Sequence, residues 1–433
     1  MSAINAKASR KMKKYAVLTR EPRCFLGSLA FSWEQRKLED YLTVSAEKNT
    51  GNIYGRSDVL SVSGDYGIVN QIEFQGRSFA GASVSNYGVV QTGDVVYTKS
   101  PLNSNPYGII KTNKGKPGIV STLYAVYHPK ENAFSDFIQV YFEQHARMNN
   151  YMHPLVNKGA KNDMKVSAEN ALKGPVCFPS RIEQESISAF FSVLDNLITL
   201  HQRKFEKLTN VKKSMLEKMF PQNGCSYPEI RFKGFTDAWE QRKVSELAEK
   251  TYGGGTPSTL NEAYWDGDIP WIQSSDVVDG RLFGVVPRKR ITQYGLNNSA
   301  TQLVPKNSIA IITRVGVGKL AFMPYSYATS QDFLSLSKLN AEPLFTVYAC
   351  YKKLQSELNA VQGTSIKGIT KDELLAKTVM VPQYAEQQQI GAFFSQLDNL
   401  ITLHQRELEK LQNIKKSMLE KMFVYGGTRK WES

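Results

Sequence analysis

The sequence contains one long stretch twice, and this repeat constrains the fold more than any other feature. The first copy is Glu183–Phe220, and the second is Glu386–Phe423, 203 positions later; 30 of the 38 positions are identical. In both copies apolar residues recur at alternating spacings of three and four, which is the heptad pattern of packed helices. We therefore predict two long helices, each with an apolar stripe wider than a two-helix seam needs.

The heptad positions define the predicted seam. Ser180 and Glu183 have capping-box spacing at the start of the first helix, and Pro221 ends it. His201 and His404 occupy matching seam positions, and we interpret them as polar residues that set the register rather than as ligands. The predicted seam residues are Ile187, Phe190, Leu194, Leu197, His201, Leu208, Ile390, Phe393, Leu397, Leu400, His404 and Leu411.

The repeat extends beyond the helices. The words W-E-Q-R-K begin at Trp33 and again at Trp239, and a V-x-x-P step precedes each helix, at Val176–Pro179 and Val379–Pro382. The chain therefore reads as two tandem units, each longer than a solenoid repeat. Between these edges, 40–175 and 245–378 combine short β-type runs, turn signals and helical patches, which predicts mixed α/β domains.

The helices are almost the same, whereas the two domains share little sequence identity. Positions predicted to face outward also match between the copies, and they are Asn196/Asn399, Thr199/Thr402, Gln202/Gln405, Arg203/Arg406, Lys212/Lys415, Lys213/Lys416 and Ser214/Ser417. Two similar helix surfaces suit two copies of one partner, and two different domains suit two different targets. The alternative is a recent duplication or recombination that copied the helix without selection for a partner.

Composition narrows the class of protein. The chain has 433 residues and a net charge of +14, which favours a nucleic acid or another polyanion as partner over a merely basic protein. The four cysteines are scattered without a C-x-x-C pair, which fits a reducing, cytoplasmic compartment. No apolar run approaches the ~18 residues that a membrane crossing needs.

Catalytic motifs are missing from the sequence. An amino-methyltransferase would need a [D/N/S]-P-P-[Y/F/W] loop, and Ser104–Tyr107 lacks the second proline. Val315–Lys319 contains G-x-G and G-K, but Leu320 follows the lysine where a P-loop has Ser or Thr. The five histidines show no metal-ligand spacing. We predict that this chain is not an enzyme and binds no metal or cofactor itself.

Several words in the sequence resemble those of a known family. They are Gly253–Ser258 (G-G-G-T-P-S), Tyr264–Ile272 (Y-W-x-G-D-I-P-W-I), Thr313–Gly316, Ala328–Phe333, Val90–Tyr97, Gly118–Ser121 and the P-x-x-x-E-Q-x-x-I start of both helices. On these words, residues 31 to 423 resemble the specificity (DNA-recognition) subunit of a type I restriction–modification system. The first domain lacks the G-G-T-P-S word, which is ordinary in a family whose recognition domains diverge.

The resemblance implies a fold and a set of partners. It implies an α/β (α+β) fold, with two target recognition domains separated by two long antiparallel helices in a pseudo-two-fold tandem repeat. Each domain would read one half of a split site in double-stranded DNA, and the helices would set the gap. Two modification subunits, which carry S-adenosylmethionine and methylate adenine, would dock near the helix seam. Restriction subunits, with ATP and Mg, would join through them.

The resemblance also suggests domain boundaries. The expected parts are a basic leader (1–30), recognition domain 1 (31–180), the central helix (181–220), a linker (221–236), recognition domain 2 (237–382), the C-terminal helix (383–423) and a tail (424–433). Two other function classes stay open: a stand-alone modification enzyme or nuclease, and a coiled-coil scaffold that does not bind DNA.

DNA contacts would come from basic and polar side chains, because phosphate contacts supply affinity and base-edge contacts supply specificity. Lys111–Lys116 is predicted to be an exposed basic loop, and Gln273, Ser274 and Ser275 are possible base readers. For each residue, a solvated surface charge is the alternative. The complete set of candidates is Arg77, Lys99, Lys111, Lys114, Lys116, Gln273, Ser274, Ser275, Arg281, Arg288, Lys289, Arg290, Arg314 and Lys319.

Overall fold

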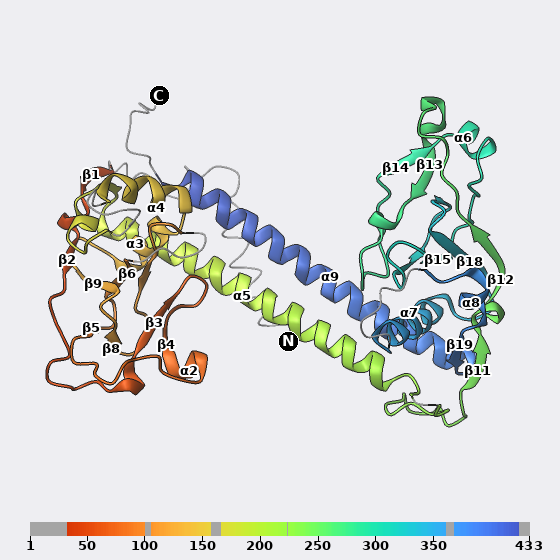
Figure 1. Cartoon of the computed structure of the whole chain (residues 1–433), viewed down its shortest axis with the longest axis horizontal. Coiled ribbons are helices and arrows are strands. Elements are labelled where there is room, and N and C mark those ends of the chain that lie inside the picture. Colours follow the sequence, from red (N-terminus) through yellow and green to blue (C-terminus); the bar gives the residue numbers. More distant parts are fainter. Residues whose placement is uncertain (1–32, 100–104, 157–165, 223, 361–367, 424–433) are drawn as a thin grey trace. The chain divides into compact units, whose positions relative to one another are not determined.

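The computed structural model describes residues 33–99, 105–156, 166–222, 224–360 and 368–423. The chain divides into two compact units, one made of Met1–Thr199 with Glu409–Ser433 and the other of Leu200–Leu408. The division falls inside both long helices, so each unit joins one α/β domain to the start of one helix and the end of the other (Figure 1).

The two repeated stretches form long helices, as the heptad pattern predicts. Helix α5 spans Arg181–Lys218 and helix α9 spans Tyr384–Lys421, with 38 residues each. At ~1.5 Å per residue, each helix is about 57 Å long. At the start of α5, Ser180 Oγ accepts a hydrogen bond from Glu183 N at 3.4 Å. The Glu183 carboxylate accepts from Trp33 Nε1 instead of returning to Ser180, so only half of the predicted capping box forms.

The sheets of the two domains have the same strand order despite their different sequences. Each consists of four antiparallel strands, and in each the second strand of the sheet is the last of the four in the sequence. In the first domain the order is β2 (Leu42–Val44), β9 (Tyr124–Pro129), β6 (Val95–Thr98) and β7 (Ile110–Thr112). In the second it is β12 (Ala248–Gly253), β18 (Phe333–Leu339), β15 (Ser308–Ile312) and β16 (Leu320–Met323).

Smaller elements complete each domain. The first domain adds β3 (Leu60–Ser63), β4 (Gly67–Asn70), α2 (Gln71–Gln75), β5 (Gly88–Val90), β8 (Gly118–Val120), α3 (Ser135–Phe142), α4 (His145–Met152) and short 3-10 turns at Leu38–Asp40, Arg56–Asp58, His153–Leu155 and Asn170–Leu172. The second adds β13 (Trp265–Ile272), β14 (Lys289–Ile291), α6 (Gln293–Asn297), β17 (Ala328–Thr329), α7 (Pro343–Ala360), α8 (Lys371–Ala376) and 3-10 turns at Val244–Glu246, Glu262–Tyr264 and Ser274–Asp276.

The repeated words at the domain edges are strand partners. In the first unit β1 (Glu34–Lys37) pairs antiparallel with β10 (Pro175–Phe178). In the second, β11 (Glu240–Lys243) pairs in the same way with β19 (Thr378–Val381). Each domain is thus closed by a two-stranded ribbon just before its helix begins, which explains why W-E-Q-R-K and V-x-x-P occur together in both repeats.

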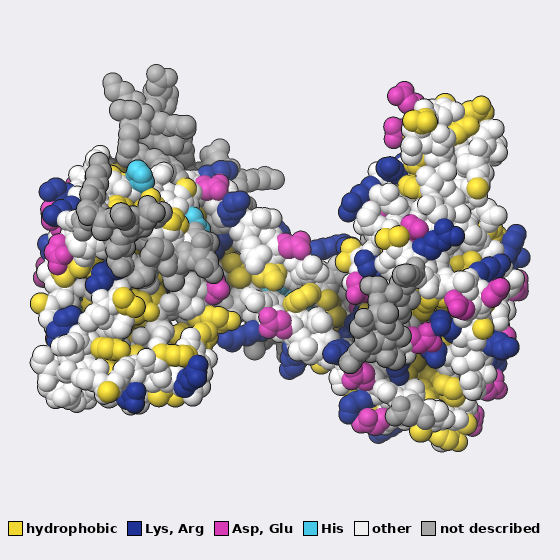
Figure 2. Space-filling view, viewed as in Figure 1, with side chains coloured by type: hydrophobic (Ala, Val, Ile, Leu, Met, Phe, Trp, Pro, Cys, Tyr) yellow, Lys and Arg dark blue, Asp and Glu magenta, His cyan; other side chains and the backbone are white. Residues whose placement is uncertain are grey.

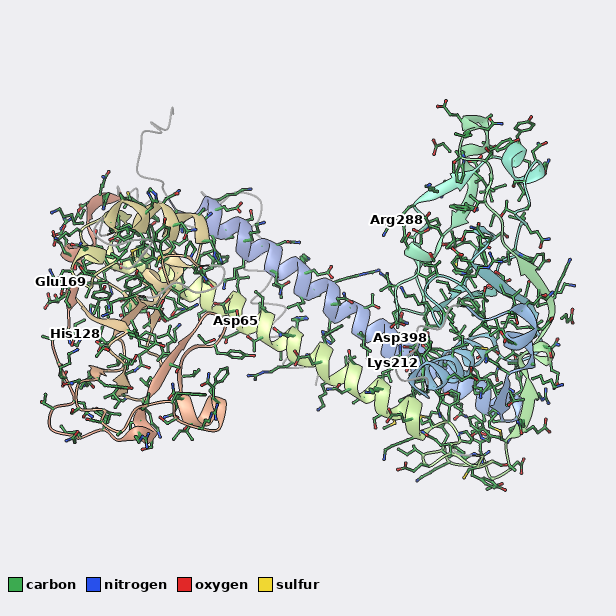
Figure 3. The ribbon with its side chains drawn as sticks, viewed as in Figure 1. Asp65, His128, Glu169, Lys212, Arg288 and Asp398 are labelled. Carbon is green, nitrogen blue, oxygen red and sulfur yellow. The ribbon has the colours of Figure 1, made fainter. Side chains whose placement is uncertain are left out.

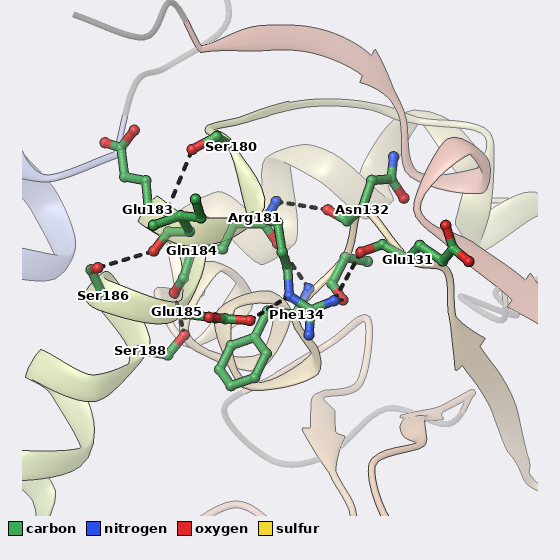
Figure 4. A network of polar contacts seen from close by, with 12 residues as sticks. Glu131, Asn132, Phe134, Ser180, Arg181, Glu183, Gln184, Glu185, Ser186 and Ser188 are labelled. Carbon is green, nitrogen blue, oxygen red and sulfur yellow. Dashed lines mark hydrogen bonds and ion pairs between the residues drawn. The ribbon is translucent and has the colours of Figure 1, made fainter. Parts of the chain in front are cut away.

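The glutamine of the E-Q word fastens each helix start to its domain. Gln184 Nε2 donates to Pro179 O at 3.0 Å, and Gln184 Oε1 accepts from Phe134 N at 2.9 Å (Figure 4). In the second unit Gln387 Nε2 donates to Pro382 O at 2.7 Å, and Gln387 Oε1 accepts from a domain backbone amide. Both glutamines are buried, so this short word specifies a structural contact in each repeat.

Aromatic residues at equivalent helix positions build the core of each unit. In the first, Phe191 of α5 lies 6.1 Å, between ring centroids, from Phe423 just beyond α9. In the second, Phe394 of α9 lies 6.0 Å from Phe220 just beyond α5. The start of one helix therefore packs against the end of the other in both units, so α5 and α9 are antiparallel, as the family resemblance implies.

Candidate DNA interface and helix seam

The first half of the predicted basic loop is a buried strand. Lys111 lies in β7 and is only 8% exposed, and the following Asn113 is buried. Burial lowers the pKa of Lys111, while Glu143 opposes this shift. All three residues of β7 are buried, so this strand is covered on both faces, and the sequence alone did not reveal that cover. The prediction of an exposed loop from Lys111 to Lys116 is therefore corrected for residues 111–113.

The other basic candidates of the first domain lie nearer to solvent. Arg77 is exposed, with its guanidinium 4.6 Å from the ring centroid of Phe79. Lys114 and Lys116 are exposed, and Lys114 Nζ forms an ion pair with Asp136 at 3.0 Å. Lys99 is half-buried, and this burial lowers its pKa. Lys114, Lys116 and Arg77 are thus the most accessible cations of this candidate set.

In the second domain, three of the sequence words that carry the family resemblance contact one another. Gly255 N donates to Thr329 O at 2.8 Å, and Gly255 O accepts from Trp271 Nε1 at 3.0 Å. A Cβ on Gly254 would lie 1.8 Å from Ser330 O, so only glycine fits there. The G-G-G-T-P-S word therefore acts as scaffold, because it lets the backbone approach the strand that follows Tyr327 and fixes β13.

The basic run Arg288–Arg290 is exposed at the edge of this scaffold. Figure 2 shows Lys and Arg side chains gathered beside β14, which carries Lys289 and Arg290. Lys289 Nζ lies 5.2 Å from the ring centroid of Trp265, and Arg290 Nη1 donates to the main-chain oxygen of Asp268 at 2.9 Å. Arg288 extends from the ribbon just before β14 (Figure 3). Contacts with the fold thus hold all three side chains while leaving them in reach of a ligand.

The possible base readers lie on a 3-10 turn. Gln273 precedes the turn Ser274–Asp276, and its backbone N–H donates to Asp276 Oδ2 at 3.1 Å. Ser275 is exposed, whereas Gln273 and Ser274 are half-buried. Asp276 was not among the sequence candidates, although an Asp three residues after Gln273 has the spacing of a capping contact.

The remaining candidates of the second domain occupy loops. Arg281 is exposed after β13, and Arg314 is exposed in the turn that joins β15 to β16. Lys319 closes this turn and is half-buried. Because Gly316 and Gly318 have positive φ and the turn joins two antiparallel strands, Val315–Lys319 does not have the strand-to-helix setting of a P-loop.

The helix seam contains most of the predicted apolar positions. Ile187, Leu194, Ile390, Leu397 and Leu411 are buried. Half-buried members that pack on the two cores are Phe190, Leu197, Leu208 and Phe393. Leu400 differs from the prediction, because its side chain is 44% exposed. The stripe steps four residues from Leu397 to the half-buried Ile401, which leaves Leu400 on the flank.

The two predicted seam histidines meet. His201 Nδ1 lies 3.1 Å from His404 Nδ1, so one ring donates a proton and the other accepts it. Burial lowers the pKa of both rings, and His201 further lowers the pKa of His404. Within the described residues no group of three or more His, Cys, Asp or Glu side chains is placed to hold a metal ion. The pair is therefore a polar contact across the seam in this structure.

Two ion pairs across the seam were missed by the sequence analysis. Lys212 Nζ lies 2.6 Å from Asp398 Oδ1 in one unit, and Lys415 Nζ lies 2.6 Å from Asp195 Oδ1 in the other (Figure 3 labels the first pair). Lys212 is buried, so its predicted outward orientation is wrong. The signal was present in the repeat: a Leu-Asp pair and a Lys-Lys pair recur in both copies, 203 positions apart.

Comparisons with known proteins agree with this fold. Residues 236–413 match the model of the type I restriction modification DNA specificity domain. This part of the chain is similar to that family of domains. A Methanocaldococcus jannaschii protein assigned as the type I restriction enzyme MjaX specificity subunit is 22% identical over 411 residues, which are 91% of this chain and 93% of that protein.

Two further comparisons concern one similar sequence and one similar fold. The type I restriction enzyme MjaIX specificity subunit of the same organism is 28% identical over 193 residues, 43% of this chain and 44% of that protein. A crystal structure of a type I restriction–modification system S subunit from M. genitalium covers 93% of this chain and 98% of its own, with a TM-score of 0.58 and 12% identity, which shows a shared fold.

The predicted resemblance to type I specificity subunits and the α/β fold class are therefore confirmed. The specificity family is the non-catalytic part of type I restriction–modification systems, in agreement with the prediction that this chain is not an enzyme. No helix in the described ranges is long and apolar enough to cross a membrane.

Proposed function

We propose that this specificity chain reads a split site in double-stranded DNA, with one half-site for each domain. The observation that carries the proposal is the contrast between the repeats. The helices are identical at 30 of 38 positions, whereas the domains keep one strand order with little sequence in common. A constant frame that presents two different surfaces suits a reader of two different half-sites, as in a dimer on spaced sites.

Basic side chains supply the affinity for DNA. Lys114 and Lys116 in the first domain and Lys289 and Arg290 in the second are exposed cations on short loops or strand edges. The net charge of +14 adds a long-range attraction to the phosphate backbone. The partly exposed turn of Gln273 to Ser275 offers amide and hydroxyl groups for base edges.

The helices dock two modification subunits. Helix α5 carries an open groove of about 500 Å³ that is lined by Arg203, Glu206, Lys207, Asn210, Val211, Ser214 and Met215. Six of these seven residue types recur on α9 at positions 203 later, with Ile414 in place of Val211. The exposed leucines Leu200 and Leu403 are also equivalent positions. Two like surfaces that combine apolar and charged groups suit two copies of one protein partner.

Catalysis then resides in the partners. The modification subunits would carry S-adenosylmethionine and methylate adenine, and the restriction subunits would bring ATP and Mg. This chain would bind no cofactor of its own and would act in the cytoplasm. The lengths of α5 and α9 would fix the undefined gap between the half-sites.

Single-molecule sequencing of modified adenines tests the proposal in a host that carries this chain with its modification subunit. The expected result is a split motif of two short defined halves around a fixed gap. The alternative is a coiled-coil scaffold that does not bind DNA. The scaffold predicts no new modification and no salt-dependent DNA affinity of the purified complex, and this result would refute the proposed function.

A further inference from the structure

A carboxylate enclosed in the second domain contacts two elements of the candidate DNA interface. The Asp276 side chain is 0% exposed. Its Oδ2 accepts the Gln273 backbone N–H, which fixes the turn of possible base readers. Its Oδ1 has no hydrogen-bond partner within the described residues, and Arg288 Nε lies 3.4 Å from it as an ion pair. One buried anion therefore ties the Gln273–Ser275 turn to Arg288.

This contact orients the guanidinium of Arg288. The carboxylate approaches it from the Nε side, whereas the side chain as a whole is 69% exposed. Within the described part of the chain, neither Nη1 nor Nη2 makes a hydrogen bond. The two-pronged end of the guanidinium thus points toward solvent with its donors free. A guanidinium held in this way keeps its directional fork and loses little conformational freedom on binding.

The net charge of the pair decides which DNA group the fork suits. Arg288 and Asp276 together are neutral, so they add little to the attraction for phosphate, which depends on net positive charge. The neighbouring Arg290 differs, because it donates to the neutral main-chain oxygen of Asp268 and keeps its full charge. A neutralised but oriented fork matches a pair of acceptors on a base edge, and guanine presents such a pair, O6 and N7, in the major groove.

We propose that Arg288 reads a guanine in the half-site of the second domain and that Asp276 is the positioning residue that aims it. This inference rests on the proposed function and deepens it, because it assigns a base to one named side chain. It also separates Arg288 from Lys289 and Arg290, which keep the role of phosphate contacts.

The first test is the motif itself, determined on the complex of this chain with its modification subunits. A split motif whose second-domain half contains a G·C pair is expected. A split motif whose second-domain half contains only A·T pairs would overturn the guanine assignment while leaving the proposed function intact. Absence of any split motif would instead refute the proposed function.

The second test uses binding of the same complex to duplexes in which that guanine is replaced by 7-deazaguanine, which lacks the N7 acceptor. We expect the replacement to weaken binding of the unaltered complex about 10-fold and to leave Arg288→Ala nearly unaffected. Asp276→Asn retains an oxygen for Gln273 N but removes the charge. As with Arg288→Ala, replacing guanine with 7-deazaguanine should then weaken binding less than it does for the unaltered complex. Arg288→Lys keeps the positive charge but lacks the paired Nη donors. Its binding to guanine and 7-deazaguanine duplexes should also be nearly equal, and this comparison replaces the Asp276 variant if that variant does not fold.

The matched control is Arg290→Ala. It should lower the slope of log affinity against log salt by about 0.9 and weaken binding to every sequence. Arg288→Ala should leave that slope unchanged. A slope that falls by about 0.9 in Arg288→Ala, with equal loss on normal and 7-deazaguanine duplexes, would make Arg288 a phosphate contact and overturn the inference.

Discussion

Lys212 of α5 and Asp398 of α9 form an ion pair at 2.6 Å that is almost closed to solvent. Asp398 also accepts a hydrogen bond from Tyr348 Oη at 2.7 Å, so this pair joins both helices to the second domain. The equivalent Lys415 contacts Asp195 and, at 2.7 Å, Glu143 of the first domain. The same helix residues therefore fasten two different domains, with Tyr348 and Glu143 as the domain partners.

Removing one member of this pair should be costly. Lys212→Met leaves the Asp398 carboxylate without its cation in a nearly dry site, and we expect a loss of about 3 kcal/mol in the free energy of unfolding. Chemical denaturation, monitored by the fluorescence of the tryptophans in the second unit, measures this loss in the free energy of unfolding. The double variant Lys212→Met with Asp398→Leu should recover much of the loss. A double variant less stable than the single one would contradict this account of the pair.

The histidine pair should make the seam sensitive to acid. Burial lowers the pKa of His201 and His404 from the ordinary value of 6.5. The unfolded chain then takes up protons at a higher pH than the folded chain, so stability from this pair is present above pH ~6.5 and is lost as pH falls below it. Glu407 and Lys204 are the charged neighbours that modulate the shift.

The variant His201→Gln with His404→Gln keeps a polar seam without the titration. Thermal unfolding at pH 7.5 and pH 5.0 should show a smaller acid-induced fall in Tm for this variant than for the unaltered chain. An equal fall in both proteins would assign the acid sensitivity to other groups.

The equivalence of the helix ends predicts that half of the chain can pair with itself. Residues 33–222 contain α5 and the first domain, and Phe220 in a second copy can take the place that Phe423 occupies beside Phe191. Lys212 of the second copy can replace Lys415 beside Glu143. We expect this fragment to be a dimer by light scattering. The matched variant Phe220→Ala should weaken the dimer, and a fragment that is monomeric and folded would contradict the prediction.

Within the basic run Arg288–Arg290, we expect Lys289 and Arg290 to contribute to affinity for DNA of any sequence. Replacing all three residues with Ala should weaken binding to every duplex and flatten the salt dependence. If only Lys289 and Arg290 contact phosphate, the salt slope should fall by about 1.8, whereas three phosphate contacts would lower it by about 2.7. An unchanged slope would remove the whole run from the phosphate interface.

Sequence reasoning recovered the parts of this fold that have a periodic or repeated signal. The apolar stripe predicted α5 and α9. The E-Q word supplies Gln184 and Gln387, whose side chains hydrogen-bond to the backbone of each domain. Sequence reasoning was wrong where the burial of a side chain depends on the register of a sheet or on which side of a helix faces its partner. Lys111 lies in a buried strand, although the basic residues around it predicted an exposed loop. Lys212 is buried by partners that are distant in the sequence.

The candidate site shows the same division. The G-G-G-T-P-S word was recognisable, but its role as scaffold follows from the space at Gly254, which only the fold defines. The sequence did not predict a role for Asp276, because an acidic residue is not an expected DNA contact. Its importance comes from burial and from the approach of Arg288, which is separated from it by a loop.

The measurement that tests the central claim most directly is the motif of modified adenines before and after a domain exchange. Residues 40–175 would be replaced with the corresponding segment of another specificity chain, with both helices and residues 245–378 unchanged. The account predicts a split motif in which one half changes while the other half and the gap stay the same. A motif that changes in both halves, or an undivided motif, would contradict the reading of one half-site by each domain.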